Sequence, residues 1–538
     1  MPAEEGVPGR LDRLSQATLG SHVAVLERAS RSRSTDPLLV LADRTYSCAD
    51  VLAHSSRVAS LLVSVGVQRG DRVVIILPTV PESVWAWLGT NICGGIDAPL
   101  SPDVSGVMLD YYLQDLEPRA VVGTREALER VARSAFVPDF AVVVGAWDGS
   151  PWAGPRVQHV HIDDDNAGTS PHQRPEEGSP SDDEVATILY TSGTTGPSKG
   201  VMLSRGYYTE MAVSHLRAVP LARGAKAYCA QPLHHVDARS MVVDCLVAQA
   251  TLVLAERFSA SGFWADVERH DVDVFYFIGT MLHLIHLQPD RESEQTMRRR
   301  IGIGSAVPAA IHASFQKRFN VALVEGYGMT EAPFMTSQTL ECSSPGNVGH
   351  PLDSIEARLV DHQDQDVRGH QVGELVIRPK RPHVMMLGYW RKPEATEASM
   401  RDGWFHTGDL MRRREDGSLV YVGRRKDSIR RRGENVSAWE VEQIALRHPS
   451  VCEAAAFGVP SPLGEEDVAM LLVPAEDQVI DVEQLHRHLG EHLPRFAVPR
   501  FLEVVDSLPK TPSERVAKGA VRERGLTSRA FDAQIRRG

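Results

Sequence analysis

The segment Tyr190–Gly200, YTSGTTGPSKG, decides how this chain is interpreted. Glycines and hydroxyl-bearing side chains fill it, and Lys199 is its single cation. Glycines let backbone N–H groups converge on an anion, serine and threonine add donors, and a lysine adds charge, so such a loop suits a phosphate. A flexible linker has a similar composition. Because the segment begins at the last residue of VATILY, a predicted buried strand, a phosphate-binding loop is the favoured interpretation.

The position of the lysine separates this loop from the two best-known phosphate loops. A Walker A loop places the lysine after a glycine and before a hydroxyl residue. Here Lys199 follows Ser198 and precedes Gly200, so that pattern fails. The GxGxxG pattern of dinucleotide-binding folds is absent as well. The loop therefore indicates phosphate binding of a different kind.

Length and composition restrict the class of protein. A chain of 538 residues predicts several domains, and 24% charged with 42% hydrophobic residues is typical of globular proteins. The net charge of −12 argues against a nucleic-acid partner. The six cysteines form no CxxC pair, which argues against a zinc site or a disulfide framework and fits a reducing compartment. Neither a signal peptide nor a long apolar run is found, so we expect a cytoplasmic protein without a membrane span. The oligomeric state is not readable.

Most of the chain alternates short apolar runs with amphipathic ones. RVVIILP (Arg72–Pro78) and VDVFYFI (Val272–Ile278) read as buried strands, and PESVWAWLGTNICG (Pro81–Gly94) reads as a helix. This alternation predicts an α/β fold with largely buried sheets. The acidic, Ser/Pro/Gly-rich stretch 163–183 is expected to be an exposed connector.

The composition of the sequence changes near Gly423. The basic run GRRKDSIRRRGEN leads into a smaller region of alternating helices and strands, predicted to be a compact α+β unit. We therefore predict two domains, residues 1–423 and 424–538, with a hinge between them. A nucleic-acid patch is the alternative interpretation of the basic run, and the acidic balance of the chain disfavours it.

Together with the loop, four later stretches resemble the adenylate-forming superfamily, which includes acyl-CoA synthetases, peptide-synthetase adenylation domains and beetle luciferases. They are GYGMTEAP (Gly326–Pro333), GWFHTGDL (Gly403–Leu410), GRRKDSIRRRGENVS (Gly423–Ser437) and LPKTPSERVAKG (Leu508–Gly519). The resemblance covers nearly the whole chain and is greatest to acid–CoA ligases of the carnitine/crotonobetaine kind. It implies a large N-terminal region of several subdomains, built of stacked sheets and helices, followed by a small mobile α+β domain.

The resemblance implies a two-step reaction and assigns residues to it. A carboxylate attacks the α-phosphorus of ATP to give an acyl-adenylate and pyrophosphate, and a thiol, usually that of CoA, then displaces AMP. Such chemistry needs positioned donors and Mg²⁺ more than covalent catalysis. In this family Tyr327 would stack on adenine beside Ser305 and Ala306, Thr330 would contact the α-phosphate, and Glu331 would hold Mg²⁺. The residues expected to grip the β- and γ-phosphates are Thr191, Ser192, Gly193, Thr194, Thr195, Gly196 and Lys199.

Later motifs supply the remaining implied roles. Asp409 would accept hydrogen bonds from the ribose hydroxyls, since an ionised carboxylate only accepts. Arg424 would help to hold the ribose or phosphate, and Lys426 would be the hinge. Gly433 and Glu434 would approach the thiol acceptor. Each role has a simpler alternative: Glu331 would be an ordinary surface glutamate, Asp409 a turn or cap aspartate, and the basic run a solvated face.

The C-terminal motif departs from the family. The usual PKTxxGK reads PKTPSERVAK here, so that Glu514 replaces the glycine and Arg515 the lysine that bridges the acyl carboxylate and the α-phosphate. Arginine keeps the charge but is planar and bulkier, which makes the exchange non-conservative. Arg515 or Lys518 would then serve as the catalytic cation, and the alternative is a damaged adenylation step.

The acid pocket is expected at His234, His235, Gly279 and Phe334. The histidines, Asp237 and Arg239 together favour a small or polar acid. Two further functions stay open within the superfamily: adenylation of nitrite for diazotisation of an aryl amine, and transfer to a carrier-protein thiol. An ATP-binding pseudoenzyme is the rival from another class, and Arg515 is its only support. The expected small molecules are ATP, Mg²⁺ and the acid, with CoA as co-substrate.

Overall fold

The computed structural model describes residues 15–145, 161–162, 180–191, 198–291, 294, 297–341, 343–425, 428–431, 434–461, 466–493, 495, 497–511 and 516–533. Its chain forms two compact units. The first comprises Met1–Thr191, Lys199–Glu356 and Pro379–Ala398, and the second comprises Ser192–Ser198, Ala357–Arg378 and Ser399–Gly538. The predicted domain division at Gly423/Arg424 stays a prediction.

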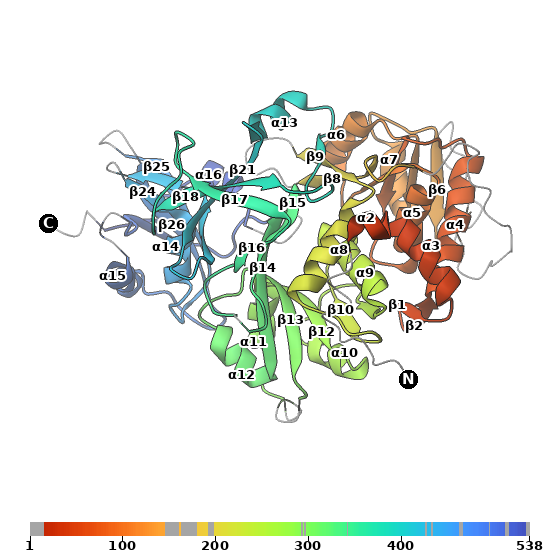
Figure 1. Cartoon of the computed structure of the whole chain (residues 1–538). Helices are drawn as coiled ribbons and strands as arrows, with labels where there is room; N and C mark the ends of the chain where they lie inside the picture. The colour runs from red at the N-terminus through yellow and green to blue at the C-terminus, as the bar shows by residue number, and fades with distance from the viewer. Residues whose placement is uncertain are drawn as a thin grey trace. The chain divides into compact units, whose positions relative to one another are not determined.

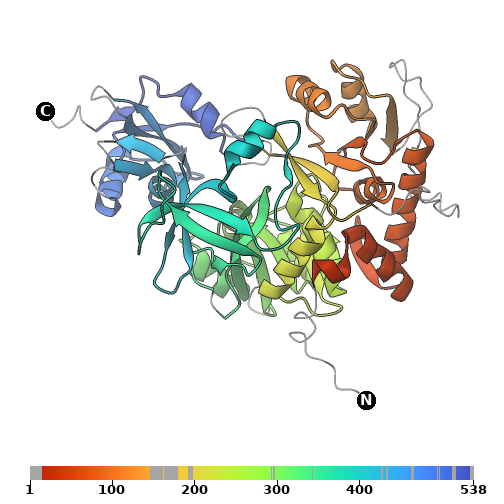
Figure 2. The ribbon, with the colours of Figure 1, turned by 45° about the horizontal axis from the view of Figure 1, so that its top comes forward.

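The first unit contains an eight-stranded sheet that carries the two strands on either side of the glycine-rich loop (Figure 1). Most of its strands are parallel, and β8 and β9 form an antiparallel pair, drawn in yellow in Figures 1 and 2. In sheet order the strands are β19 (Gly388–Tyr389), β9 (Lys199–Ser204), β8 (Val185–Thr191), β4 (Ile96–Pro99), β3 (Arg72–Ile76), β5 (Ala120–Gly123), β6 (Phe140–Val144) and β7 (His161–Ile162).

A nine-stranded sheet of the same unit carries the GYGMTE stretch. Its central strands β10 to β14 are parallel, and β14 turns back into the antiparallel β15. In sheet order the strands are β16 (His350–Pro351), β15 (Ala332–Ser337), β14 (Val321–Met329), β13 (Arg300–Ser305), β12 (Val274–Ile278), β10 (Lys226–Cys229), β11 (Thr251–Leu254), β1 (Pro37–Leu41) and β2 (Arg44–Ser47).

Helices cover these sheets, as the alternating pattern predicted. The predicted helix after the strand at Arg72 is α5; it has Pro81 in its first turn and is buried along its length except at Glu82. A Cβ on its Gly89 would lie 2.7 Å from the carbonyl oxygen of Ser55, so glycine lets α5 approach α4 closely. The helices are α2 (Gln16–Leu19), α3 (His22–Ser32), α4 (Cys48–Ser64), α5 (Pro81–Ile92), α6 (Gly106–Leu116), α7 (Arg125–Ala132), α8 (Tyr207–Ala218), α9 (Val236–Ala248), α10 (Phe263–Arg269), α11 (Gly279–His286), α12 (His312–Phe319) and α13 (Pro393–Ser399).

The second unit holds a five-stranded antiparallel sheet and a smaller α+β region. The small region has its own apolar core, which includes Val441, Met470 and Leu485. The strands of the five-stranded sheet are β17 (Ile355–Val360), β18 (Val372–Pro379), β21 (Trp404–Arg413), β20 (Met400–Arg401) and β22 (Leu419–Arg424). The small region contains β23 (Ser428–Arg431), β24 (Glu434–Ser437), α14 (Ala438–Ala445), β25 (Val451–Pro460), β26 (Glu466–Pro474), α15 (Val482–His492), β27 (Phe501–Val504), α16 (Lys518–Arg524) and β28 (Phe531–Asp532).

The predicted α/β class is confirmed, and most predicted strands and helices are present with shorter bounds. The helix predicted over Pro81–Gly94 ends at Ile92, for example. Most of the expected connector 163–183 lies outside the described residues. Among the described helices, none is both long and apolar enough to cross a lipid bilayer.

Candidate active site

The two ends of the glycine-rich loop are brought together by a strand pair. Thr191 at the end of β8 lies opposite Lys199 at the start of β9 in the antiparallel register. Its hydroxyl lies 3.5 Å from the Lys199 carbonyl oxygen. Ser192, Gly193, Thr194, Thr195 and Gly196 lie outside the described residues. Their phosphate-binding role stays a prediction, and the structure places Lys199 at the base of the loop.

Lys199 and Glu331 are joined through Tyr389, which sequence reasoning missed. The Lys199 ammonium lies 4.7 Å from the centre of the Tyr389 ring, and the Tyr389 hydroxyl donates to Glu331 Oε1 at 2.8 Å. Burial, and then the nearby Glu331 carboxylate, raise the pKa of Tyr389, so the hydroxyl stays protonated as a donor. Tyr389 is distant in sequence from both partners, and only the pairing of β19 with β9 brings it there.

The turn that carries Thr330 and Glu331 is fixed by its backbone. The Tyr207 hydroxyl donates to the Thr330 carbonyl at 3.1 Å, and the Met386 N–H donates to the Glu331 carbonyl at 2.8 Å. Glu331 is buried. Its carboxylate supplies hard oxygen atoms of the kind that Mg²⁺ prefers, since Mg²⁺ binds through one or two carboxylates together with substrate phosphates.

The segment predicted to lie along adenine is built by close backbone packing. Ser305 ends β13 opposite Ile278 of β12, and Gly279 follows directly. A Cβ on Gly279 would lie 1.8 Å from the carbonyl oxygen of Ala306, which itself has φ +60°, so only glycine fits there. Tyr327 is half-buried on β14. Ser305, Ala306 and Gly279 are therefore brought together, and Tyr327 lies on the strand next to β13.

Glu325 supports this segment and was also missed by sequence reasoning. Its Oε1 accepts the Val307 N–H at 3.2 Å. Burial raises the pKa of this carboxyl from 4.5 to about 8, although hydrogen bonds from the Val307 and Ala306 backbone act in the opposite direction. Nothing in the pattern of the sequence indicated that a carboxyl would be enclosed here.

The raised pKa of Glu325 predicts a pH-dependent loss of stability. The Glu325 carboxyl has a pKa near 4.5 in the unfolded chain and about 8 in the folded protein. Its contribution to stability is therefore complete below about pH 4.5, and it is lost as the pH rises through about 8. Glu325→Gln is neutral and keeps an acceptor for Val307. We expect its melting temperature to fall less than that of the wild type between about pH 6 and about pH 9. If plots of Tm against pH for the wild type and for Glu325→Gln run parallel, this assignment is contradicted.

The expected acid-pocket residues carry ring contacts. The His234 and His235 rings lie 4.4 Å apart between centres, and burial lowers the pKa of His234 to about 3, so it is uncharged at neutral pH. A Cβ on Gly326 would lie 2.6 Å from the Phe334 ring, which places this ring against the strand that carries Tyr327.

Behind Phe334 lies a polar pair that the sequence did not indicate. The ring centre of Phe334 is 4.4 Å from that of His215 in an edge-on contact, and His215 Nδ1 is 2.9 Å from Asp244 Oδ2. Both partners of the pair are buried. His215 lies on α8 and Asp244 on α9, so the packing of these two helices creates the pair.

Two residues used to argue for a polar acid are engaged elsewhere. The guanidinium of Arg239 is buried, pairs with Asp97, lies 4.8 Å from the Trp87 ring centre and donates to the Leu233 carbonyl at 2.7 Å. Asp237 accepts the Tyr276 hydroxyl at 2.7 Å. Arg239 and Asp237 therefore have partners inside the fold, because a buried cation needs to pair with a carboxylate, and the polar character of the pocket stays a prediction.

In the second unit, Asp409 and Arg424 meet across a strand pair. They are opposite in the register of β21 and β22, and Arg424 Nε lies 3.2 Å from Asp409 Oδ1. Asp409 is 2% exposed. Lys426 and Gly433 lie outside the described residues, and Glu434 begins β24. The pairing is consistent with a joint role, and the roles themselves stay predictions.

The alternative catalytic cation Lys518 is held inside the small region. At the start of α16 its ammonium pairs with Glu442 of α14 and lies 3.1 Å from the Ala456 carbonyl, while Glu442 Oε1 accepts the Ala456 N–H at 2.6 Å. The Lys518 and Glu442 side chains are 14% and 12% exposed. Arg515 lies outside the described residues. Lys518 is thus paired within the small region, and the choice between Arg515 and Lys518 stays a prediction.

Removal of this ion pair predicts a clear loss of stability. Lys518→Met leaves the largely enclosed Glu442 carboxylate without its cation, which we expect to cost about 3 kcal/mol. Thermal unfolding should show a Tm several degrees lower. The double variant Lys518→Met/Glu442→Gln removes both charges and keeps an acceptor for Ala456, so it should recover most of the loss. An unchanged Tm for the single variant would contradict this expectation.

Comparison with known families identifies the protein class. A family model described as AMP-binding enzyme matches residues 26–390. The chain belongs to the AMP-binding enzyme family. The model of the AMP-binding enzyme C-terminal domain matches residues 440–515. Membership confirms the resemblance drawn from the five motif stretches.

Related AMP-binding enzymes include several CoA ligases. A feruloyl-CoA synthase from an Amycolatopsis species is 32% identical over 482 residues, which cover 88% of this chain and 93% of that protein. A crotonobetaine/carnitine–CoA ligase from Citrobacter koseri is 27% identical over 494 residues, 88% and 92% of the two chains. The predicted similarity to ligases of the latter kind is confirmed, although the feruloyl-CoA synthase matches at higher identity.

Solved structures of family members match the whole fold. The o-succinylbenzoate CoA synthetase of Bacillus subtilis in complex with its acyl-adenylate intermediate gives a TM-score of 0.81 at 25% identity, covering 94% of this chain and 99% of that chain. The same synthetase has been solved with ATP and a magnesium ion, with a TM-score of 0.79 at 25% identity over 93% and 99% of the two chains. The predicted large N-terminal and small C-terminal organisation is confirmed.

Proposed function

We propose that this AMP-binding enzyme joins a carboxylic acid to CoA in two steps. The acid carboxylate attacks the α-phosphorus of ATP, pyrophosphate leaves, and the CoA thiol then displaces AMP from the acyl-adenylate. The observation that carries the proposal is the contact chain Lys199–Tyr389–Glu331, which links the glycine-rich loop to the GYGMTE turn. Membership of a family rich in CoA ligases supports the choice of acceptor.

The residue roles follow from the chemistry of the donors. We infer that Lys199 and the loop hydroxyls bind the β- and γ-phosphates, and that Thr330 contacts the α-phosphate. Glu331 would hold Mg²⁺, which supplies positive charge where phosphate oxygens gain negative charge. Tyr389 would keep that carboxylate oriented. Asp409 would accept the ribose hydroxyls, with Arg424 beside it.

We propose a small or polar acid as the substrate. With Arg239 engaged by Asp97, the polar groups of the expected pocket are His234 and His235, and Phe334 lies edge-on against His215. Phe334 supplies an aromatic face that would also suit a planar acid. An acid with one ring or a short chain and one polar group satisfies both features.

The test is release of pyrophosphate from ATP and Mg²⁺ against a panel of short polar acids, aromatic acids and nitrite, each with and without CoA. The proposal predicts release with a carboxylic acid and formation of its CoA thioester. Release with nitrite that does not depend on CoA would identify a diazotising enzyme instead. Transfer to a carrier-protein thiol, with none to CoA, would change the acceptor. ATP binding without release for any acid would identify a pseudoenzyme.

A further inference from the structure

Strand β21 contains an irregularity directly before Asp409. In the antiparallel pair with β18, Glu374 is opposite Leu410 and Val376 is opposite His406. Three residues of β21, including Asp409, therefore face the single residue Leu375. Gly408 within this bulge has φ +73°, a conformation that glycine adopts without strain. Bulges of this kind redirect the side chains that follow them.

The polar groups of the bulge are satisfied by specific partners. The Thr407 hydroxyl donates to the Leu375 carbonyl at 2.7 Å and accepts the Asp409 N–H at 3.1 Å. The Gly408 N–H donates to the Glu374 carboxylate, Oε1, at 2.9 Å. A side chain from the neighbouring strand thus replaces the ladder partner that the bulge removes.

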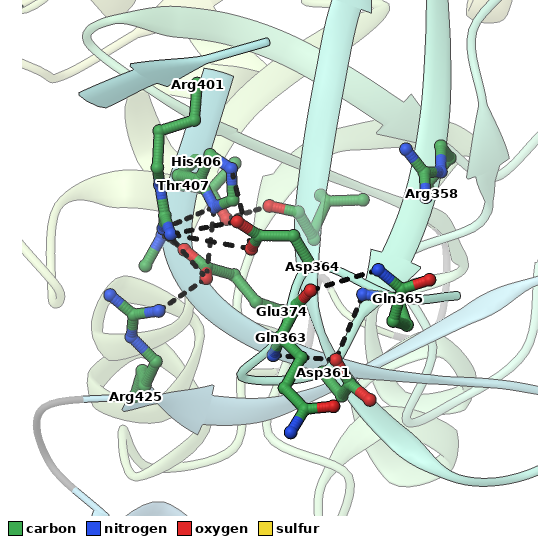
Figure 3. A network of polar contacts seen from close by, with 12 residues as sticks. Arg358, Asp361, Gln363, Asp364, Gln365, Glu374, Arg401, His406, Thr407 and Arg425 are labelled. Carbon is green, nitrogen blue, oxygen red and sulfur yellow. Dashed lines mark hydrogen bonds and ion pairs between the residues drawn. The ribbon is translucent and has the colours of Figure 1, made fainter. Parts of the chain in front are cut away.

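The second oxygen of Glu374 reaches a different segment of the chain (Figure 3). Glu374 Oε2 accepts Arg425 Nη1 at 2.8 Å and lies 3.3 Å from His406 Nδ1. Arg401 is also near, at 3.9 Å. The Glu374 side chain is 3% exposed while that of Arg425 is 55% exposed. One buried carboxylate therefore bridges the bulge and the end of β22.

This bridge lies beside the Asp409–Arg424 pair. The consecutive arginines Arg424 and Arg425 each contact one carboxylate, that of Asp409 at 3.2 Å and that of Glu374 at 2.8 Å. Glu374 is also linked to Asp409 along the chain, because it accepts the N–H of Gly408, the residue before Asp409. Loss of the Glu374 carboxylate would release both the Gly408 N–H and the Arg425 guanidinium.

We propose that Glu374 is a positioning residue for nucleotide binding. By accepting the Gly408 N–H and the Arg425 guanidinium, it fixes the bulge that presents Asp409 to the ribose of AMP or ATP. This inference rests on the proposed function, in which Asp409 binds the ribose. Small displacements of a binding carboxylate are costly, since a misplacement of about 1 Å can reduce activity about 100-fold.

The experiment measures AMP binding by calorimetry at a temperature well below the Tm of each variant. We expect Glu374→Ala to raise the Kd for AMP about tenfold. Glu374→Gln keeps an oxygen for the Gly408 N–H and should bind AMP within about threefold of the wild type. The matched control is Asp366→Asn, which removes an ion pair with Arg358 in the same unit, where Asp366 is 66% exposed; its Kd should not change.

Three outcomes would overturn the inference: wild-type affinity in Glu374→Ala, a Glu374→Gln variant as weak as Glu374→Ala, or equal weakening in Asp366→Asn. A merely structural Glu374 would lower the Tm and leave the Kd unchanged. Failure of the wild type itself to bind AMP is a separate result, and it would remove the proposed function and this inference with it.

Discussion

Glu331→Gln is expected to lower the rate of pyrophosphate release roughly 100- to 1,000-fold, the loss that removal of one electrostatic group at a transition state usually causes. The amide keeps the shape of the side chain and an oxygen that can accept the Tyr389 hydroxyl, which donates to Glu331 at 2.8 Å. What it loses is the negative charge that Mg²⁺ prefers. The assay follows pyrophosphate at increasing Mg²⁺ concentration, where the variant should need more metal.

Two further variants sharpen this test. Tyr389→Phe keeps the ring beneath the Lys199 ammonium but removes the donor to Glu331, so we expect a smaller loss of about tenfold. Glu341→Gln is the matched control, because Glu341 is an exposed glutamate in the same unit and should leave the rate unchanged. A Glu331→Gln enzyme with the metal dependence and rate of the wild type would show that another group holds the metal.

Arg515→Ala is expected to reduce the adenylation half-reaction about 100-fold or more, because a positioned cation at the attacking carboxylate and the α-phosphate is lost. Exchange of labelled pyrophosphate into ATP measures this step alone. Thioester formation from an added acyl-adenylate should fall far less. The choice of Arg515 over Lys518 rests on the contacts of Lys518, which pairs with Glu442 and approaches the Ala456 carbonyl within the small region.

The two cations can be separated by their different readouts. Lys518→Met should lower the Tm and affect the exchange rate only through folding, whereas Arg515→Ala should lower the exchange rate at unchanged Tm. Arg515→Lys restores the residue usual in the family and should retain adenylation. If Lys518→Met abolishes exchange without a change in Tm, Lys518 is the catalytic cation and the assignment is reversed.

The sequence by itself determined the family of this protein, because five motif stretches resemble the adenylate-forming superfamily and the family model matches residues 26–390. Such motifs are local, since each lies within a few consecutive residues, and the roles of their residues stay predictions. The same holds for the α/β class, because the apolar runs and amphipathic segments alternate along the chain.

Only the tertiary structure decided which side chains support these motifs. Tyr389 reaches Glu331, Glu374 reaches Gly408 and His215 reaches Asp244 through strand pairing and helix packing, and no local pattern records such contacts. It also decided which expected residues are engaged elsewhere. Arg239 pairs with Asp97 and Lys518 with Glu442, because a cation enclosed by the fold needs a carboxylate, and sequence does not show which cations become enclosed.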